Sequence, residues 1–222
     1  MGIRTIDELV DRLDEGMAWR RIEMQALKSA IAEAESRSPH SPLTRALARS
    51  GVALLYAHWE GYVKDSCAAY VEYIARRRLR CSELNDGLLI TVLESLGKRM
   101  TSGDEEARKA LLEAVRQPND SRARIPKTAM VDTKSNLRYQ VLADIFLKIG
   151  LPIENFATKG NFIDITLCDS RNSIAHGRDY FPVPADFPTL MDEVMGMMEQ
   201  VHDLITSAAR LSLYRNAVPS QA

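Results

Sequence analysis

Residues 42–80, PLTRALARSGVALLYAHWEGYVKDSCAAYVEYIARRRLR, decide the fold because they predict one long helix with little polar surface. Ser41 and Pro42 suit the N-cap and the first helical position. Apolar residues cover much of the circumference of this helix, which indicates a central, buried element. Gly51 and Gly61 interrupt it without a proline, so we expect a bend or close helix packing there rather than a stop.

The flanking sequence predicts further helices around this central one. Thr5 followed by Glu8 is typical of a capping box, and apolar residues spaced three and four apart predict a long first helix from Ile6 to Ala34. The alternation of apolar and polar residues that is typical of strands is missing. Residues 118–134 are expected to form a loop. The other helices are expected over residues 82–100, 102–117, 135–151, 161–177 and 186–214. We therefore predict an all-α antiparallel bundle with long first, second and last helices.

The composition is that of an ordinary globular protein, and we expect one domain over residues 1–222 with an ordered core of about 5–215. The net charge is −1, so any RNA or DNA binding must come from a local patch. The cysteines show neither disulfide nor metal spacing, which indicates reduced thiols in the cytoplasm. No apolar run approaches the roughly 18 residues that a membrane span needs. We expect no membrane partner.

The remaining histidines suggest no metal site. His40, His58 and His202 show no ligand spacing with one another or with a cysteine. No glycine-rich phosphate loop and no nucleophile elbow is present. We therefore expect neither a metal nor another cofactor.

The stretch RNSIAHG, residues 171–177, ends one of the expected helices and carries the main functional candidate. On a wheel of about 100° per residue, four residues form the core face, while Asp169, Asn172 and His176 lie on the far side. Those core-face residues are Ile163, Leu167, Ser170 and Ile174. Arg171 lies between the two faces. Gly177 is a natural stop, so His176 occupies the last turn and points away from the bundle centre.

This helix end holds the groups needed to cleave RNA without a metal. The negative end of the helix favours imidazolium and Arg171 opposes it, so His176 can both take and give a proton. Asn172 can hydrogen-bond the ring, and Arg171 can bind a phosphate at two points. One histidine per chain is too few for both acid and base, and a homodimer would supply two. The alternative is a solvated surface histidine.

These residues resemble the HEPN superfamily. Arg171 and His176 match its R-x4–6-H motif, and YAHWEGYVK, residues 56–64, resembles the bacterial MAE-type branch, also named RiboL-PSP-HEPN. The resemblance implies a dimeric helical bundle and a metal-independent endoribonuclease, often a toxin of toxin–antitoxin or phage-defence systems with an antitoxin or defence partner. It implies catalytic roles for Arg171 and His176, with Asn172 assisting. The family also includes non-catalytic modules that bind a protein or RNA.

The sequence departs from the family at one regulatory position. Some HEPN toxins carry a tyrosine two residues after the histidine, where a partner nucleotidyltransferase modifies them. Here that position is Arg178, and the nearest tyrosine is Tyr180. We therefore do not predict this modification.

Several further residues have both a structural and a functional interpretation. Glu60 and Lys64 form an i,i+4 pair that either stabilises the helix or places Glu60 against the active arginine or histidine. A basic cluster either complements the helix dipole or binds the RNA backbone. That cluster comprises Arg77, Arg78, Arg80, Arg122, Arg124, Lys127 and, beside the motif, Arg178. The methionines Met195, Met197 and Met198 indicate core or dimer packing.

Overall fold

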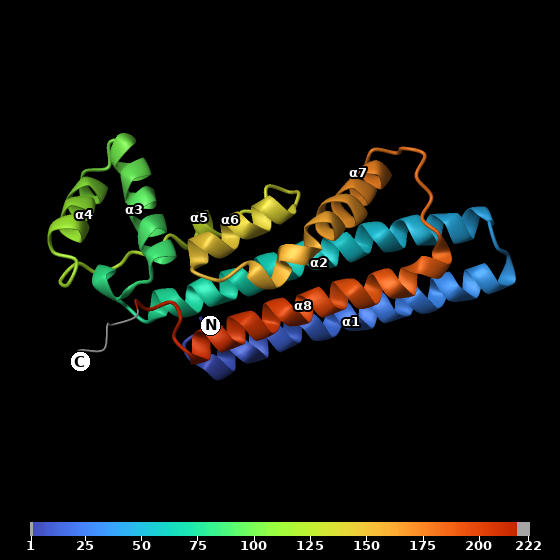
Figure 1. Cartoon of the computed structure of the whole chain (residues 1–222), viewed down its shortest axis with the longest axis horizontal. Helices are drawn as coiled ribbons and strands as arrows, with labels where there is room; N and C mark the ends of the chain where they lie inside the picture. The colour runs from blue at the N-terminus through green and yellow to red at the C-terminus, as the bar shows by residue number, and fades with distance from the viewer. Residues whose placement is uncertain (1, 217–222) are drawn as a thin grey trace.

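The computed structural model describes residues 2–216, apart from the side chains of residues 128 and 129. Three long helices lie side by side in an elongated bundle (Figure 1): α1 (Ile6–Arg37), α2 (Pro42–Arg76) and α8 (Phe187–Arg210). α2 and α8 both run opposite to α1. The described residues contain helices and no strand. This confirms the predicted all-α antiparallel bundle with long first, second and last helices.

Shorter helices cover one side and one end of this bundle. They are α3 (Asp86–Thr101), α4 (Glu105–Arg116), α5 (Lys127–Met130), α6 (Tyr139–Ile149) and α7 (Ser170–Ala175). Short 3₁₀ segments are η1 (Cys81–Glu83), η2 (Glu154–Lys159) and η4 (Pro184–Asp186), and η3 (Phe162–Asp169) is a π-helix. α3 packs on α4 and α6, whereas α5 and α7 pack on α2 (Figure 1). Within residues 2–216 no helix is long and apolar enough to cross a bilayer.

Local sequence signals fix the starts of the two long N-terminal helices. The Thr5 hydroxyl accepts a hydrogen bond from the Glu8 amide at 3.1 Å, and the Glu8 carboxylate accepts one from the Thr5 amide at 3.0 Å. The Ser41 hydroxyl accepts from the Thr44 amide at 3.1 Å, with Pro42 as the first helical residue. These bonds satisfy amides that have no partner inside the helix.

Several predicted boundaries differ from the structure, and left-handed residues explain two of them. α2 ends at Arg76 rather than at residue 80, because Arg78 has a left-handed φ of 54°. The helix expected from residue 135 begins at Tyr139, because Lys134 and Ser135 have φ of 53° and 55°. The expected loop over 118–134 contains the short helix α5. A left-handed residue breaks the helical hydrogen-bond series, and side-chain patterning does not reveal it.

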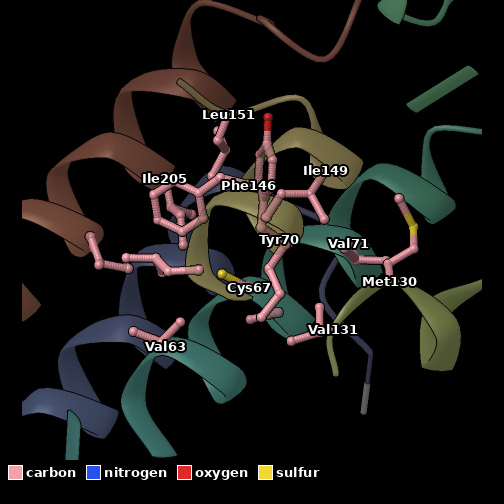
Figure 2. Packing of buried hydrophobic residues seen from close by; sticks show 14 of the residues in the cluster. Val63, Cys67, Tyr70, Val71, Met130, Val131, Phe146, Ile149, Leu151 and Ile205 are labelled. Atoms are coloured by element: carbon pink, nitrogen blue, oxygen red, sulfur yellow. The ribbon is translucent and has the colours of Figure 1, made fainter. Parts of the chain in front are cut away.

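The core is built around α2, as its apolar circumference predicted. Trp59, Tyr62 and Tyr70 of this helix are completely buried. Figure 2 shows Tyr70 and Cys67 beside Phe146 of α6 and Ile205 of α8, so α2 is covered by elements from distant parts of the sequence. The three clustered methionines of α8 are also buried, which confirms a packing role for them.

Gly51 marks a close approach of the long helices. A Cβ atom there would lie 2.7 Å from a ring carbon of Phe187 and 2.9 Å from the end of Ile31. We expect Gly51→Ala to lower the free energy of unfolding by about 1 kcal/mol, because overpacking outweighs the gain in helix propensity. Gly196→Ala in α8, where the new methyl meets open space, should instead raise it by about 1 kcal/mol. Urea denaturation of both variants tests this, and a stabilised Gly51→Ala would contradict the close packing.

Candidate active site

The helix that carries RNSIAHG changes its winding halfway along. Residues Phe162–Asp169 are π-helical and Ser170–Ala175 are α-helical, so the uniform 100° wheel was wrong for the first half. In a π-helix the backbone hydrogen bonds join residues five positions apart instead of four. Each turn therefore holds more residues, and two successive residues lie closer to the same face of the helix. Leu167 and Cys168 are accordingly both buried. Such winding frequently occurs at functional sites.

Gly177 is the C′ residue that stops this helix, as predicted. Gly177 has a φ of 66°, and its amide donates to the Ile174 carbonyl at 3.1 Å. The Arg178 amide donates to the Ser173 carbonyl at 2.9 Å, which completes a Schellman motif. His176 is therefore the C-cap residue, and it is exposed. Its ring makes no hydrogen bond or ion pair within residues 2–216.

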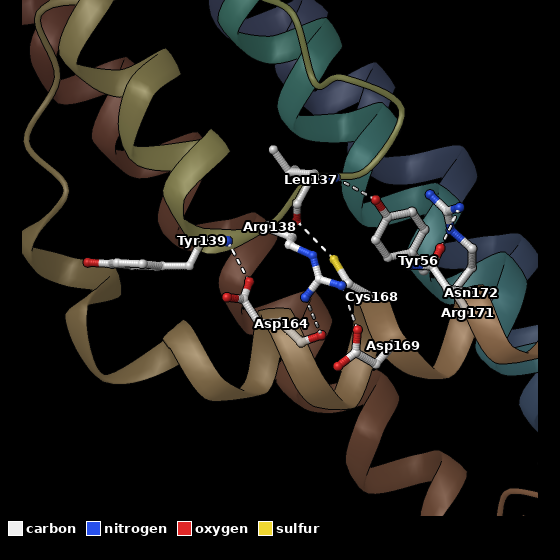
Figure 3. A network of polar contacts seen from close by, with 9 residues as sticks. All are labelled: Tyr56, Leu137, Arg138, Tyr139, Asp164, Cys168, Asp169, Arg171 and Asn172. Carbon is white, nitrogen blue, oxygen red and sulfur yellow. Dashed lines mark hydrogen bonds and ion pairs between the residues drawn. The ribbon is translucent and has the colours of Figure 1, made fainter.

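Arg171 is held in one orientation by contacts on several sides. Its guanidinium lies 4.3 Å from the ring centre of Tyr56 (Figure 3). It also donates at 2.7 Å to the Ser135 carbonyl. A second nitrogen donates at 2.9 Å to the side-chain oxygen of Asn172. The Glu60 carboxylate lies 3.7 Å away, and the side chains of Arg171 and Glu60 are only 23% and 17% exposed. The guanidinium is thus positioned before any ligand arrives.

The predicted supporting residues occupy different places. Glu60 contacts Arg171, as one of its two interpretations predicted. Lys64 is exposed and forms no ion pair with Glu60, whose carboxylate faces the arginine instead. Asn172 was expected to hydrogen-bond the ring of His176, but its side-chain oxygen accepts from Arg171. Asn172 therefore orients the arginine in this structure.

A network behind Arg171 binds the segment that supplies the Ser135 carbonyl (Figure 3). The Leu137 amide donates at 2.6 Å to the Tyr56 hydroxyl, and Arg138 pairs with Asp169 at 2.6 Å. The Tyr139 amide, at the start of α6, donates to Asp164 at 2.7 Å. The segment before α6 is thereby tied both to α2 and to η3.

Burial raises the pKa of two groups in this network. It raises the pKa of Tyr56 above its usual range, so its hydroxyl stays protonated beside Arg171. It also raises the pKa of the Cys168 thiol to about 11. The thiol donates to the Leu137 carbonyl at 3.3 Å. Both groups are therefore neutral partners that build the site.

Sequence reasoning missed the roles of Tyr56 and Ser135. Tyr56 lies one helical turn before Glu60, so the two share a face of α2, and this i,i+4 relation was a usable signal. Ser135 acts through its backbone carbonyl, which residue type does not encode. No sequence pattern could have identified it.

Tyr56→Phe tests the network without removing the ring under Arg171. The variant leaves the amide of Leu137, a completely buried residue, without its partner. We expect a loss of about 1–3 kcal/mol in the free energy of unfolding, measured by urea denaturation. Tyr180→Phe is the control, because within residues 2–216 its hydroxyl accepts one hydrogen bond, from the Ser170 hydroxyl at 3.0 Å, and its removal leaves no backbone amide without a partner, so it should cost less. Equal losses for the two variants would contradict the assigned role.

The chain that follows His176 is fastened to the start of α2. The Arg49 guanidinium donates to the Arg178 carbonyl at 3.0 Å and also to the Tyr180 carbonyl. Arg45 and Arg49 each lie 5.3 Å from the ring centre of Phe181. The turn that presents His176 is therefore anchored on both sides.

The predicted basic cluster is divided among several places. Arg77, Arg78 and Arg122 line one pocket of about 490 Å³, together with two further arginines, Arg4 and Arg76. Arg80 lies 3.8 Å from Asp120, and Arg124 lies 3.9 Å from Glu106, so acids offset both charges. Lys127 lines a separate groove, and Arg178 is exposed beside His176. The seven residues thus do not form one patch.

A helical bundle with an arginine and a histidine at the end of one helix has the features of the HEPN class. The RiboL-PSP-HEPN family model matches residues 15–207, which is most of the chain. The protein therefore belongs to the RiboL-PSP-HEPN family. Comparisons with curated proteins and with solved structures found no match.

Proposed function

We propose that the protein is a metal-independent endoribonuclease that acts as a dimer through Arg171 and His176. The observation that supports this most directly is an exposed histidine, without a hydrogen-bond partner among residues 2–216, at the end of the helix that carries a pre-positioned arginine. His176 lies five residues after Arg171, about 7.5 Å along the helix axis. Family membership supports the same activity.

Arg171 keeps donors for a phosphate. A guanidinium has five N–H groups, and hydrogen bonds to Ser135 and Asn172 use two of them, so three remain. A bound phosphate oxygen gains negative charge when it is attacked, and a guanidinium held in place stabilises that charge. Arg171 acts as the phosphate clamp.

The reaction needs two proton transfers. A neutral His176 takes the proton of the ribose 2′-hydroxyl while the 2′-oxygen forms a bond to phosphorus. The bond from phosphorus to the 5′-oxygen then breaks, and an imidazolium gives that oxygen a proton. The products are a 2′,3′-cyclic phosphate and a 5′-hydroxyl.

A dimer supplies the second proton-transfer group. Each chain presents one His176, and its ring is exposed and available to a partner. With the two rings on opposite sides of one phosphate, the first is the base and the second is the acid.

The test is cleavage of single-stranded RNA by the purified protein in EDTA, with analysis of the product ends. We expect cleavage to persist and to leave cyclic phosphate and 5′-hydroxyl ends. A requirement for added metal, or products with 3′-hydroxyl ends, would contradict the proposal.

The proposed biological role is that of a toxin or phage-defence effector restrained by an antitoxin or other defence protein. Induced expression of the wild-type chain should then arrest bacterial growth, and expression of the His176→Ala chain should not. Growth at equal rates with both chains, at equal protein levels, would contradict this role.

A non-catalytic HEPN module that binds RNA or a protein partner is the second candidate. The contacts that favour it are those of Arg171 with Tyr56, Glu60 and Ser135, because they also suit a purely structural arginine. This candidate predicts RNA or protein binding without cleavage, and unchanged binding by His176→Ala.

A further inference from the structure

The lysines of this protein are concentrated in one groove. Five of its eight lysines line a groove of about 780 Å³, whereas none of its 21 arginines does. The five are Lys64, Lys98, Lys127, Lys134 and Lys148. They come from α2, α3, α5, α6 and the segment before α6, which lie together on one side of the bundle (Figure 1).

These five lysines form no ion pairs within residues 2–216. Two of the other three are paired, Lys28 with Asp192 at 3.9 Å and Lys159 with Glu193. The groove also contains three acids, and each has another contact. Glu72 binds Arg76 at 3.0 Å, Asp132 accepts from the Lys134 amide, and Asp144 accepts from Gln140. The ammonium groups therefore remain available for an anionic ligand.

The lysine groove and the candidate active site are linked by residues that are neighbours in the chain or on α2. Lys134 directly precedes Ser135, whose carbonyl binds Arg171. On α2, Lys64 follows Glu60 by one turn, and the same i,i+4 series continues through Ala68 and Glu72 to Arg76. This series rises about 24 Å along the helix. It leads from Glu60 at the Arg171 site, past Lys64 in the lysine groove, to Arg76 in the arginine pocket at the end of α2.

An acidic boundary runs along the other side of α2. A second groove, between α1 and α2, shares Ala68 and Glu72 with the lysine groove, but its lining contains five carboxylates and a single cation, Arg12. The carboxylates are those of Glu8, Asp11, Glu15, Asp65 and Glu72. Like charge repels a polyanion from this side, so a phosphate chain on α2 is confined to the lysine side.

We infer that the lysine groove holds the backbone of single-stranded RNA that extends from the Arg171–His176 site. The inference rests on the proposed function. Lysine ammonium groups are flexible point charges, and they contact phosphates without reading the bases. The lysine groove therefore supplies affinity for the RNA and sets the path of its backbone. The Arg171–His176 site selects the bond that is cleaved.

The test compares two triple variants in the His176→Ala background, where RNA is not consumed. The groove variant is Lys64→Gln, Lys98→Gln and Lys127→Gln. The matched control changes the three lysines outside the groove, Lys28, Lys109 and Lys159, to Gln, so the net charge is the same. Affinity for a labelled single-stranded RNA is measured by fluorescence anisotropy over a range of salt concentrations.

The groove variant should bind RNA about 100-fold more weakly at 0.1 M salt, with a salt slope reduced by about 2, because each lost phosphate contact removes about 0.7. The control should bind like the parent. Equal binding by the two variants, or no RNA binding by the parent, overturns the inference. Polyglutamate, measured in the same way, stands for an acidic protein. A groove variant that loses binding to polyglutamate but keeps binding to RNA also overturns the inference, because the groove then binds an acidic protein. If the wild-type chain cleaves no RNA but binds it through the groove lysines, the inferred RNA groove is supported. Only the proposed endoribonuclease activity is then contradicted.

Discussion

Replacing His176 with alanine is expected to reduce RNA cleavage by about 100- to 10,000-fold, the range typical of a lost general acid or base. In a dimer the substitution is present in both chains, so the base and the acid are lost together. The expected reduction in cleavage is therefore at the upper end of this range, about 10,000-fold. The free energy of unfolding at pH 8 should change by less than about 0.5 kcal/mol, because the ring is exposed and contacts no partner in the described residues. Cleavage of a labelled RNA and urea denaturation measure the two quantities.

The control for this variant is His40→Asn. His40 is also exposed, and asparagine tolerates its left-handed φ of 64°. It lies between α1 and α2, so its loss should leave cleavage unchanged. If His40→Asn and His176→Ala cleave at the same rate, His176 has no role in proton transfer.

Replacing Arg171 with lysine is expected to reduce kcat by about 100- to 1,000-fold, although the positive charge is kept. Lysine has no planar fork, so it cannot bind the Ser135 carbonyl, Asn172 and a phosphate together. It also loses the contact with the Tyr56 ring. The free energy of unfolding should fall by about 1–3 kcal/mol, because a half-buried network loses its centre. Single-turnover cleavage at saturating protein separates kcat from binding.

Two comparisons isolate the effect of this arginine. Arg178→Lys changes an exposed arginine nearby and should alter neither kcat nor stability. A double-mutant cycle with Glu60→Gln should give a coupling energy of about 0.5–3 kcal/mol with Arg171→Lys, as expected for residues in contact. Full activity of Arg171→Lys with normal stability would contradict both the clamp and the network.

The helices were predictable because their signals are local. Thr5 and Glu8 cap α1, Ser41 and Pro42 start α2, and Gly150 and Gly177 end helices with left-handed φ. The apolar circumference of α2 likewise identified the central helix, since a helix that is apolar over most of its surface is stable only when other elements cover most of it. Each signal acts within a few residues, so it survives in the sequence without knowledge of the fold.

The candidate site was predictable only in part. Arg171 and His176 could be placed at a helix end, because Gly177 follows them directly. The partners of Arg171 could not be predicted, because Tyr56 and Ser135 lie far from it in the sequence and Ser135 binds it through a backbone carbonyl. The π-helical winding before Ser170 was also missed, because side-chain spacing does not distinguish it from an α-helix over eight residues.

The sequence by itself therefore determined the helical class, the central position of α2 and the exposed place of His176 at a helix end. Only the tertiary structure decided which residues hold Arg171. It also brought Lys64, Lys98 and Lys127 into one groove and placed Arg80 and Arg124 beside acidic residues. The reason is physical. Helix formation and capping depend on neighbours within one or two turns, whereas an ion pair or a charged groove depends on which distant elements the buried core brings together.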